Sequence, residues 1–305
     1  MNRNIIVFLL FLTVVIVACK LSTTHHIEQE KKELPKLDTA VNIQEQQYNL
    51  AVHYWDRTVQ FSETISLTEL TSFKYHLGDY IQLLNTFPLT QSKSLMRSFL
   101  TEKILSVGVL QKTERIFEEY LYDPVSPLRN DELYAVFLKY KMSFRGIEDI
   151  YLVRTRYQLN IISKNRVGQL AENFNYVTSN SKEASLFSIK SQYTLLYFYN
   201  PDCPYCKETK LKMGESSILQ QLKSSPQKLC ILAISIAPGK SKWLKYISTL
   251  PSHWVNGYNA EIPTQERYDL RAIPSLYLLD EHKKVICKDA TFEQVENKLI
   301  ELLQQ

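Results

Sequence analysis

Two cysteines separated by two residues are the part of the sequence best suited to chemistry. Cys203-Pro204-Tyr205-Cys206 follows a nearly continuous apolar run, 193–199, and opens a segment of helical character. A sulfur at a helix N-terminus lies over unpaired backbone N–H groups and the positive end of the helix dipole, which favours its thiolate form. Pro204 suits the first helical turn, where its missing N–H is not needed. Cys203 is therefore predicted to be a nucleophile, with Cys206 poised to resolve a mixed disulfide.

An inert disulfide and half of a zinc site are the alternatives for this pair. A zinc site would need two further ligands at close spacing. The sequence has no second Cys-x-x-Cys and no His-x-x-x-His. Redox chemistry without a metal or another cofactor is therefore the prediction.

The elements around the cysteine pair alternate between strands and helices. Apolar runs predict strands at 193–199, 229–237, 275–279 and 284–288, and a hairpin with arms at 174–177 and 186–189. Helical spacing predicts helices at 204–223, 240–249 and 292–303. This alternation predicts an α/β sandwich for residues 166–305.

Residues 45–165 have a different pattern. Apolar residues at helical spacing, such as Leu77, Ile81 and Leu84, predict several packed helices and hence an all-α domain. Asn130, followed by two acidic residues, predicts a helix start. The many tyrosines and arginines are interpreted as core side chains with polar ends at the surface, rather than as a peptide-binding face.

The segment from about 166 to 305 resembles the thioredoxin superfamily, in particular the TlpA-like envelope thiol–disulfide oxidoreductases. The resemblance is carried by the strand, the Cys-x-x-Cys helix and Ala272-Ile273-Pro274 before the next strand. It implies that Pro274 is cis and lies beside the cysteines, and that the backbone of Ile273 pairs with a substrate strand. It also implies disulfide exchange with protein substrates through Cys203 and Cys206, in the direction of reduction.

Two residues depart from thioredoxin itself. Asp202 precedes Cys203 where thioredoxin has tryptophan, and Tyr197 occupies the position of its buried acid. The proton acceptor for Cys206 is therefore unassigned.

Two other functions compete with this one. A thiol peroxidase on the same fold would need a threonine or serine a few residues before its reactive cysteine, and Asn200-Pro201-Asp202-Cys203 supplies none. A non-catalytic, partner-binding lipoprotein with a degenerate redox domain would have buried, untitratable thiols at 203 and 206.

The thioredoxin strand order also separates Cys230 from Cys287. It places their strands three intervals apart, or about 14 Å at about 4.8 Å each. A disulfide needs Cα atoms within about 7 Å. Both are therefore expected to be free, mostly buried thiols.

The N-terminus carries a targeting signal. Arg3 precedes an apolar run, 5–17, that is too short to span a bilayer and ends near Cys19. The segment resembles a bacterial lipoprotein signal, which implies removal of residues 1–18, acylation of Cys19 and a tether over 19–44. An ordinary signal peptide with an incidental cysteine is the alternative. We expect a lipid-anchored protein of the bacterial envelope with soluble, periplasmic domains.

The remaining features concern partners. A net charge of +4 without Lys/Arg blocks argues against nucleic acid. The segments 120–124, 126–127, 129–134, 164–166 and 277–280 resemble bacterial envelope lipoproteins that join a helical domain of unassigned function to a thioredoxin-like domain, with the join near 165. The expected partners are protein thiols or disulfides and an envelope electron donor.

Overall fold

A computed structural model describes residues 43–56 and 66–304 of the chain. Cys19, the signal segment and most of the predicted tether lie outside these described residues. The chain divides between Tyr54 and Trp55 into two compact units, of which the first contains helix α2 (Ile43–Val52). Over the described residues, no helix combines the length and the apolar character that crossing a membrane requires.

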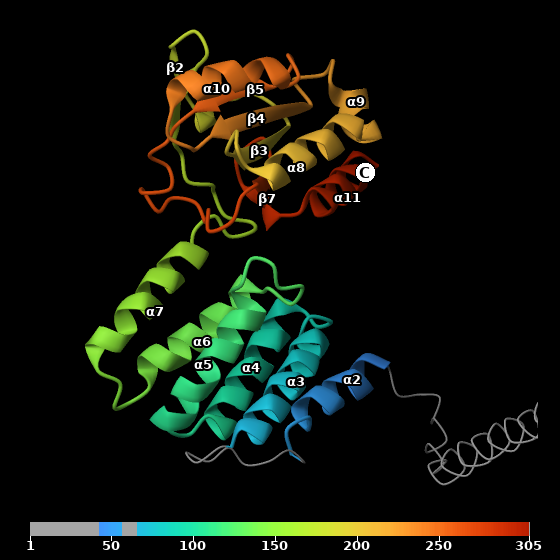
Figure 1. Cartoon of the computed structure of the whole chain (residues 1–305). Helices are drawn as coiled ribbons and strands as arrows, with labels where there is room; N and C mark the ends of the chain where they lie inside the picture. Colours follow the sequence, from blue (N-terminus) through green and yellow to red (C-terminus); the bar gives the residue numbers. More distant parts are fainter. Residues whose placement is uncertain (1–42, 57–65, 305) are drawn as a thin grey trace, which may run out of the picture. The chain divides into compact units, whose positions relative to one another are not determined.

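The second unit begins with a helical region. Its helices are α3 (Leu67–Leu84), α4 (Leu89–Lys103), α5 (Val107–Leu121), α6 (Asp131–Ser143) and α7 (Asp149–Ile162). Figure 1 shows α3, α4, α5 and α6 side by side. Aromatic rings fill their core: Phe117 stacks on Phe137 with ring centroids 4.2 Å apart. The predicted helix start at Asn130 is confirmed, because its side chain accepts hydrogen bonds from the backbone N–H groups of Glu132 and Leu133.

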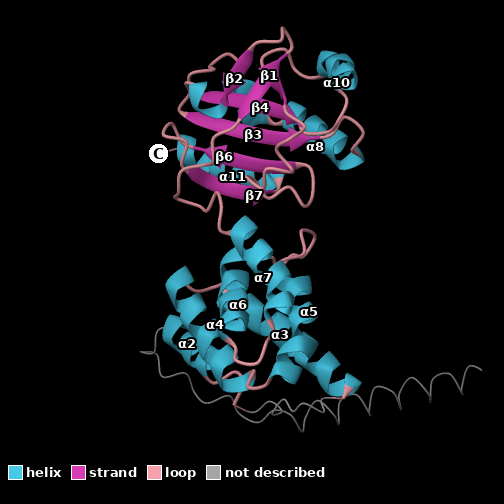
Figure 2. Ribbon diagram, turned by 90° about the vertical axis from the view of Figure 1, so that its left-hand side faces the viewer, coloured by secondary structure: helices cyan, strands magenta, loops and turns pink. Residues whose placement is uncertain are grey.

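A seven-stranded mixed sheet follows. Its strands are β1 (Asn175–Thr178), β2 (Glu183–Ser185), β3 (Tyr193–Tyr199), β4 (Leu229–Ser235), β5 (Val255–Tyr258), β6 (Ser275–Leu279) and β7 (Val285–Ala290). They lie in the order β2-β1-β5-β4-β3-β6-β7, with β3 parallel to β4 and antiparallel to β6 (Figure 2). The remaining elements are α8 (Pro204–Glu215), α9 (Ser217–Leu222), α10 (Lys240–Tyr246), α11 (Phe292–Leu303) and the short turns η1 (Leu186–Ser188) and η2 (Ile247–Thr249).

The two faces of the sheet are covered differently. On one face, side chains from α8, α9, α10 and α11, such as Met213, Trp243 and Leu299, pack against the strands. On the other face, Phe198 and its neighbours are covered by Phe174 and Tyr268, which come from segments outside the named helices and strands. The fold is thus the predicted thioredoxin-like α/β sandwich preceded by a helical region.

The observed elements differ from the expected ones at several places. The second arm of the predicted hairpin lies at β2, because 186–188 form a 3-10 turn that buries Leu186. The predicted helix 204–223 is two helices, because Ser216 is extended and caps α9. The predicted helix 240–249 ends at Tyr246 and continues as the turn η2. Strand β5 was not predicted.

The sheet order confirms the prediction for the two remaining cysteines. Strands β4 and β7, which carry Cys230 and Cys287, are three intervals apart. Both thiols are free. Helix α7 ends at Ile162 and β1 begins at Asn175, and the domain limits at 45 and 165 stay predictions.

Candidate redox site

The two cysteines lie at the first turn of α8, as the sequence predicts. Cys203 is the N-cap residue, and its Sγ accepts a hydrogen bond from the backbone N–H of Cys206 at 3.1 Å. This contact places a backbone donor on the sulfur, at the positive end of the helix dipole. Cys203 is half-buried and Cys206 is buried. The pair is therefore arranged with one sulfur accessible to a substrate and the other behind it.

The strand order brings Pro274 to this pair. Because β3 and β6 are antiparallel neighbours, the segment after β3 and the segment before β6 meet at one end of the sheet. The Ile273–Pro274 peptide bond is cis. The Sγ of Cys203 lies 3.6 Å from the carbonyl oxygen of Ile273, within reach of a weak thiol hydrogen bond. Cys203, Cys206, Ile273 and Pro274 thus form one cluster.

The environment of Cys206 keeps this residue protonated. Burial raises the pKa of the Cys206 thiol well above its usual range, and hydrogen bonding with Cys203 raises it further. Cys206 belongs to a buried cluster that also contains Tyr197 and Tyr199. At neutral pH the buried thiol is therefore the poorer nucleophile of the two, and it needs a proton acceptor when it resolves a mixed disulfide.

Tyr197, which replaces the buried acid of thioredoxin, holds the backbone of α8. Its O–H donates to the carbonyl oxygen of Cys206 at 2.6 Å. Burial raises the pKa of Tyr197 far above its ordinary value, so the phenol stays protonated and cannot take the proton of Cys206. Asp202 is exposed and pairs with Lys242.

Among residues 43–56 and 66–304, the structure shows no group of three or more His, Cys, Asp or Glu side chains arranged to hold a metal ion.

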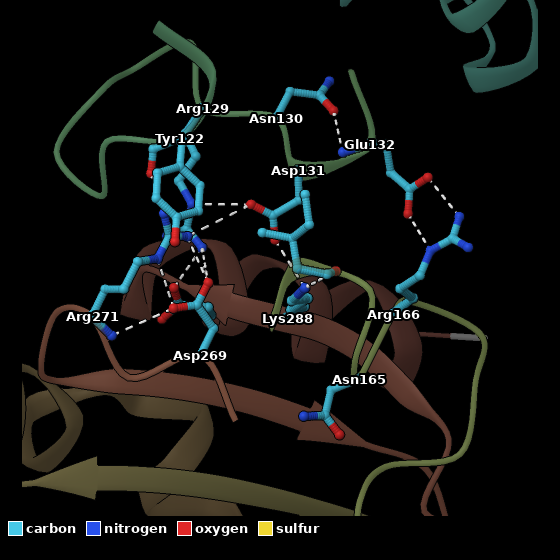
Figure 3. Close-up of polar contacts among 12 residues, drawn as sticks. Tyr122, Arg129, Asn130, Asp131, Glu132, Asn165, Arg166, Asp269, Arg271 and Lys288 are labelled. Carbon is cyan, nitrogen blue, oxygen red and sulfur yellow. Dashed lines mark hydrogen bonds and ion pairs between the residues drawn. The ribbon is translucent and has the colours of Figure 1, made fainter. Parts of the chain in front are cut away.

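A second set of residues links the helical region to the segment before Pro274 (Figure 3). The guanidinium of Arg271 lies 3.4 Å from the ring centroid of Tyr122 and donates to the Tyr122 carbonyl oxygen at 2.6 Å. Arg271 also pairs with Asp269 through two hydrogen bonds of 2.7 and 2.6 Å. Arg129 pairs with Asp289 at 2.6 Å.

Lys288 joins the same set, pairing with Asp131 at 2.9 Å and donating to the Ile162 carbonyl oxygen at 2.7 Å. In the sequence, the segments 120–124 and 129–134 are marked by their resemblance and by many charged and aromatic residues, but nothing local indicates these contacts.

Comparisons with known proteins agree with this fold. The family "Domain of unknown function (DUF5106)" matches residues 18–165, and the family "Thioredoxin-like" matches residues 191–285. No curated protein shows significant similarity to the chain.

Several solved structures are similar. A thioredoxin-like protein from Bacteroides caccae is 32% identical with a TM-score of 0.81, and the match covers 89% of this chain and 98% of that one. The C-terminal domain of an uncharacterized Bacteroides fragilis protein is 36% identical over 45% of this chain and 98% of that one, with a TM-score of 0.43. The thioredoxin domain of a thiol-disulfide oxidoreductase from Bacteroides vulgatus is 18% identical over 45% and 97%, with a TM-score of 0.40.

The C-terminal part of the chain is a thioredoxin-like domain with a Cys-x-x-Cys pair at the start of a helix. The identity and coverage of the Bacteroides caccae match then show the family of the whole chain. The chain belongs to the thioredoxin-like proteins, with a DUF5106 domain in front of its thioredoxin-like domain.

Proposed function

We propose that this protein is a thiol–disulfide oxidoreductase of the bacterial cell envelope that reduces disulfides in protein substrates. The observation that carries the proposal is the placement of the Cys203 Sγ, which accepts the Cys206 N–H at 3.1 Å and faces the Ile273 carbonyl oxygen at 3.6 Å. A nucleophilic sulfur, a resolving thiol and a backbone edge for a substrate strand are thus within a few ångströms of one another.

The reaction follows thiol–disulfide exchange. The Cys203 thiolate attacks one sulfur of the substrate disulfide, which forms a mixed disulfide and releases the other substrate sulfur as a thiolate. Cys206 then loses its proton, attacks Cys203 and releases the second substrate sulfur. Two electrons pass from the cysteine pair to the substrate, and the protein is left with a Cys203–Cys206 disulfide. A dithiol electron donor must reduce this disulfide before the next cycle.

The activity is tested on the full-length protein in detergent. Wild type is expected to accelerate the reduction of insulin disulfides by dithiothreitol, whereas Cys203→Ser abolishes the acceleration. Cys230→Ser is the matched control and retains it, because Cys230 lies on β4, away from the first turn of α8. Equal rates for wild type and Cys203→Ser would contradict the proposal.

A trapping experiment tests the order of steps. Cys206→Ser removes the resolving thiol, so mixed disulfides between Cys203 and substrate proteins are expected to accumulate in cells. They should disappear on treatment with a reductant and be absent in the double variant with Cys203→Ser. Peroxide consumption is measured on the same samples. A thiol peroxidase would consume peroxide, whereas a disulfide reductase would not.

The envelope location rests on the N-terminal sequence. Acylation of Cys19 would anchor the protein, since two or more acyl chains give stable membrane binding. Metabolic labelling with an alkyne fatty acid is expected to label wild type and not Cys19→Ser. A labelled Cys19→Ser variant, or an unlabelled wild type, would contradict the lipid anchor.

A further inference from the structure

A cleft lies beside the cis proline. Its volume is about 190 Å³, and its walls come from two parts of the chain. Ala272, Pro274 and Phe292 belong to the thioredoxin-like domain, whereas Pro124 and Arg129 belong to the segment between α5 and α6 of the helical region. The helical region therefore completes a cleft next to the candidate redox site.

We propose that this cleft binds an apolar side chain of the substrate polypeptide, close in sequence to the substrate's reacting cysteine, and that the helical region thereby selects the substrate. The inference rests on the proposed function and assigns the helical region a part in it.

The position of the cleft supports this occupant. Ala272 and Pro274 line it and flank Ile273, whose carbonyl oxygen is 3.6 Å from the Cys203 Sγ. An extended chain advances about 3.3 Å per residue, so a side chain within about three residues of the reacting cysteine reaches the cleft. The cleft is thus continuous with the path of a substrate strand.

The chemistry of the walls favours an uncharged occupant. The charged groups at the cleft are already paired: Arg129 with Asp289 at 2.6 Å, and Lys212 with Glu293 at 3.0 Å. A charged ligand would have to compete with the Arg129–Asp289 pair, whose side chains are only 16% and 10% exposed. The cleft has a volume of about 190 Å³, and its walls include the apolar side chains of Pro274, Leu276 and Phe292, which suits one leucine or phenylalanine side chain.

The wall from the helical region is fixed on both sides of Pro124. On one side, Arg271 holds the carbonyl oxygen and the ring of Tyr122. On the other side, Arg129 holds Asp289, which also accepts a hydrogen bond from Ser275 at 2.6 Å. A wall held in place before binding loses little entropy when the substrate arrives, which is the condition for selectivity from a small pocket.

The test uses peptides with a single cysteine, to which a fluorescent thiol is attached through a disulfide bond. Reduction of this bond releases the fluorescent thiol. Leucine or serine occupies, in turn, each position within three residues of the cysteine. The reduced full-length protein is mixed with each peptide, and the rate constant of single-turnover release is measured. Wild type is expected to react about tenfold faster with leucine than with serine at one of these positions.

Two variants alter the cleft, one from the thioredoxin-like domain and one from the helical region. Thr209→Phe fills it from α8, and Pro124→Gly removes a wall residue of the helical region. In both variants the rate constants for the leucine and serine peptides are expected to differ by no more than about twofold. Thr264→Phe places the same new ring on an exposed turn and is expected to keep the wild-type ratio. Two substitutions at separate places keep the test valid if one of them unfolds the protein.

The outcomes separate the inference from the proposed function. If wild type reduces all peptides at one rate, or if Thr209→Phe keeps the preference, the cleft does not bind the side chain and only the redox function stands. If wild type reduces neither the peptides nor a small aromatic disulfide, the proposed function is wrong and the inference with it.

Discussion

Replacing Arg271 by methionine is expected to destabilise the protein strongly, because it leaves a buried carboxylate without its main partner. The Asp269 side chain is 1% exposed and accepts hydrogen bonds of 2.7 and 2.6 Å from Arg271. Breaking a buried ion pair by removing one partner costs about 3–5 kcal/mol. Arg129 remains 3.9 Å from Asp269 and offsets part of this charge, so we expect a loss of about 3 kcal/mol.

The assay is urea unfolding at pH 7, followed by circular dichroism. Arg154→Met is the matched control: Arg154 is 68% exposed and pairs with Glu118, so its loss should cost at most about 1 kcal/mol. The double variant Arg271→Met with Asp269→Asn should recover part of the lost stability, because it removes the unpaired charge. If Arg271→Met unfolds at the same urea concentration as Arg154→Met, the buried pair does not stabilise the fold as argued.

Three further predictions concern single residues. Iodoacetamide should alkylate the half-buried Cys203 at mildly alkaline pH and leave Cys206 unmodified, because Cys206 is buried and burial raises the pKa of its thiol; equal labelling of both cysteines in mass spectrometry would contradict this. Gly257→Ala should cost about 1–3 kcal/mol in urea unfolding, because a Cβ would lie 2.6 Å from the ring of Tyr176. Tyr197→Phe should cost about 1 kcal/mol by losing its hydrogen bond to Cys206, and an unchanged unfolding midpoint would show that this bond contributes nothing.

The sequence by itself determined the elements whose signals are local. Strands β3 and β6 and helix α11 were predicted with the observed bounds. The two strands are nearly continuous apolar runs, and α11 has an amphipathic period that starts at a capping box formed by Thr291 and Gln294. The Cys203–Cys206 pair is local as well, because its chemistry follows from one strand end and one helix start.

Elements that depend on contacts with distant segments could not be predicted from local sequence patterns. Strand β5 has only four residues and contains Asn256 and Gly257, which disfavour a strand in isolation. It forms because Gly257 leaves room for the Ile234 and Tyr176 side chains that would meet a Cβ there. Likewise, a pattern of apolar residues cannot show that Ser216 leaves the helical conformation and caps α9.

The contacts of the site with the helical region were decided by the tertiary structure alone. Arg271 and Tyr122 are 149 residues apart in the chain, and no local propensity relates them. Such a pair forms only when the sheet order and helix packing have placed both segments at one location. The sequence identified which sulfur pair can do chemistry, whereas the packing of the helical segment against the cis-proline segment decided what surrounds it.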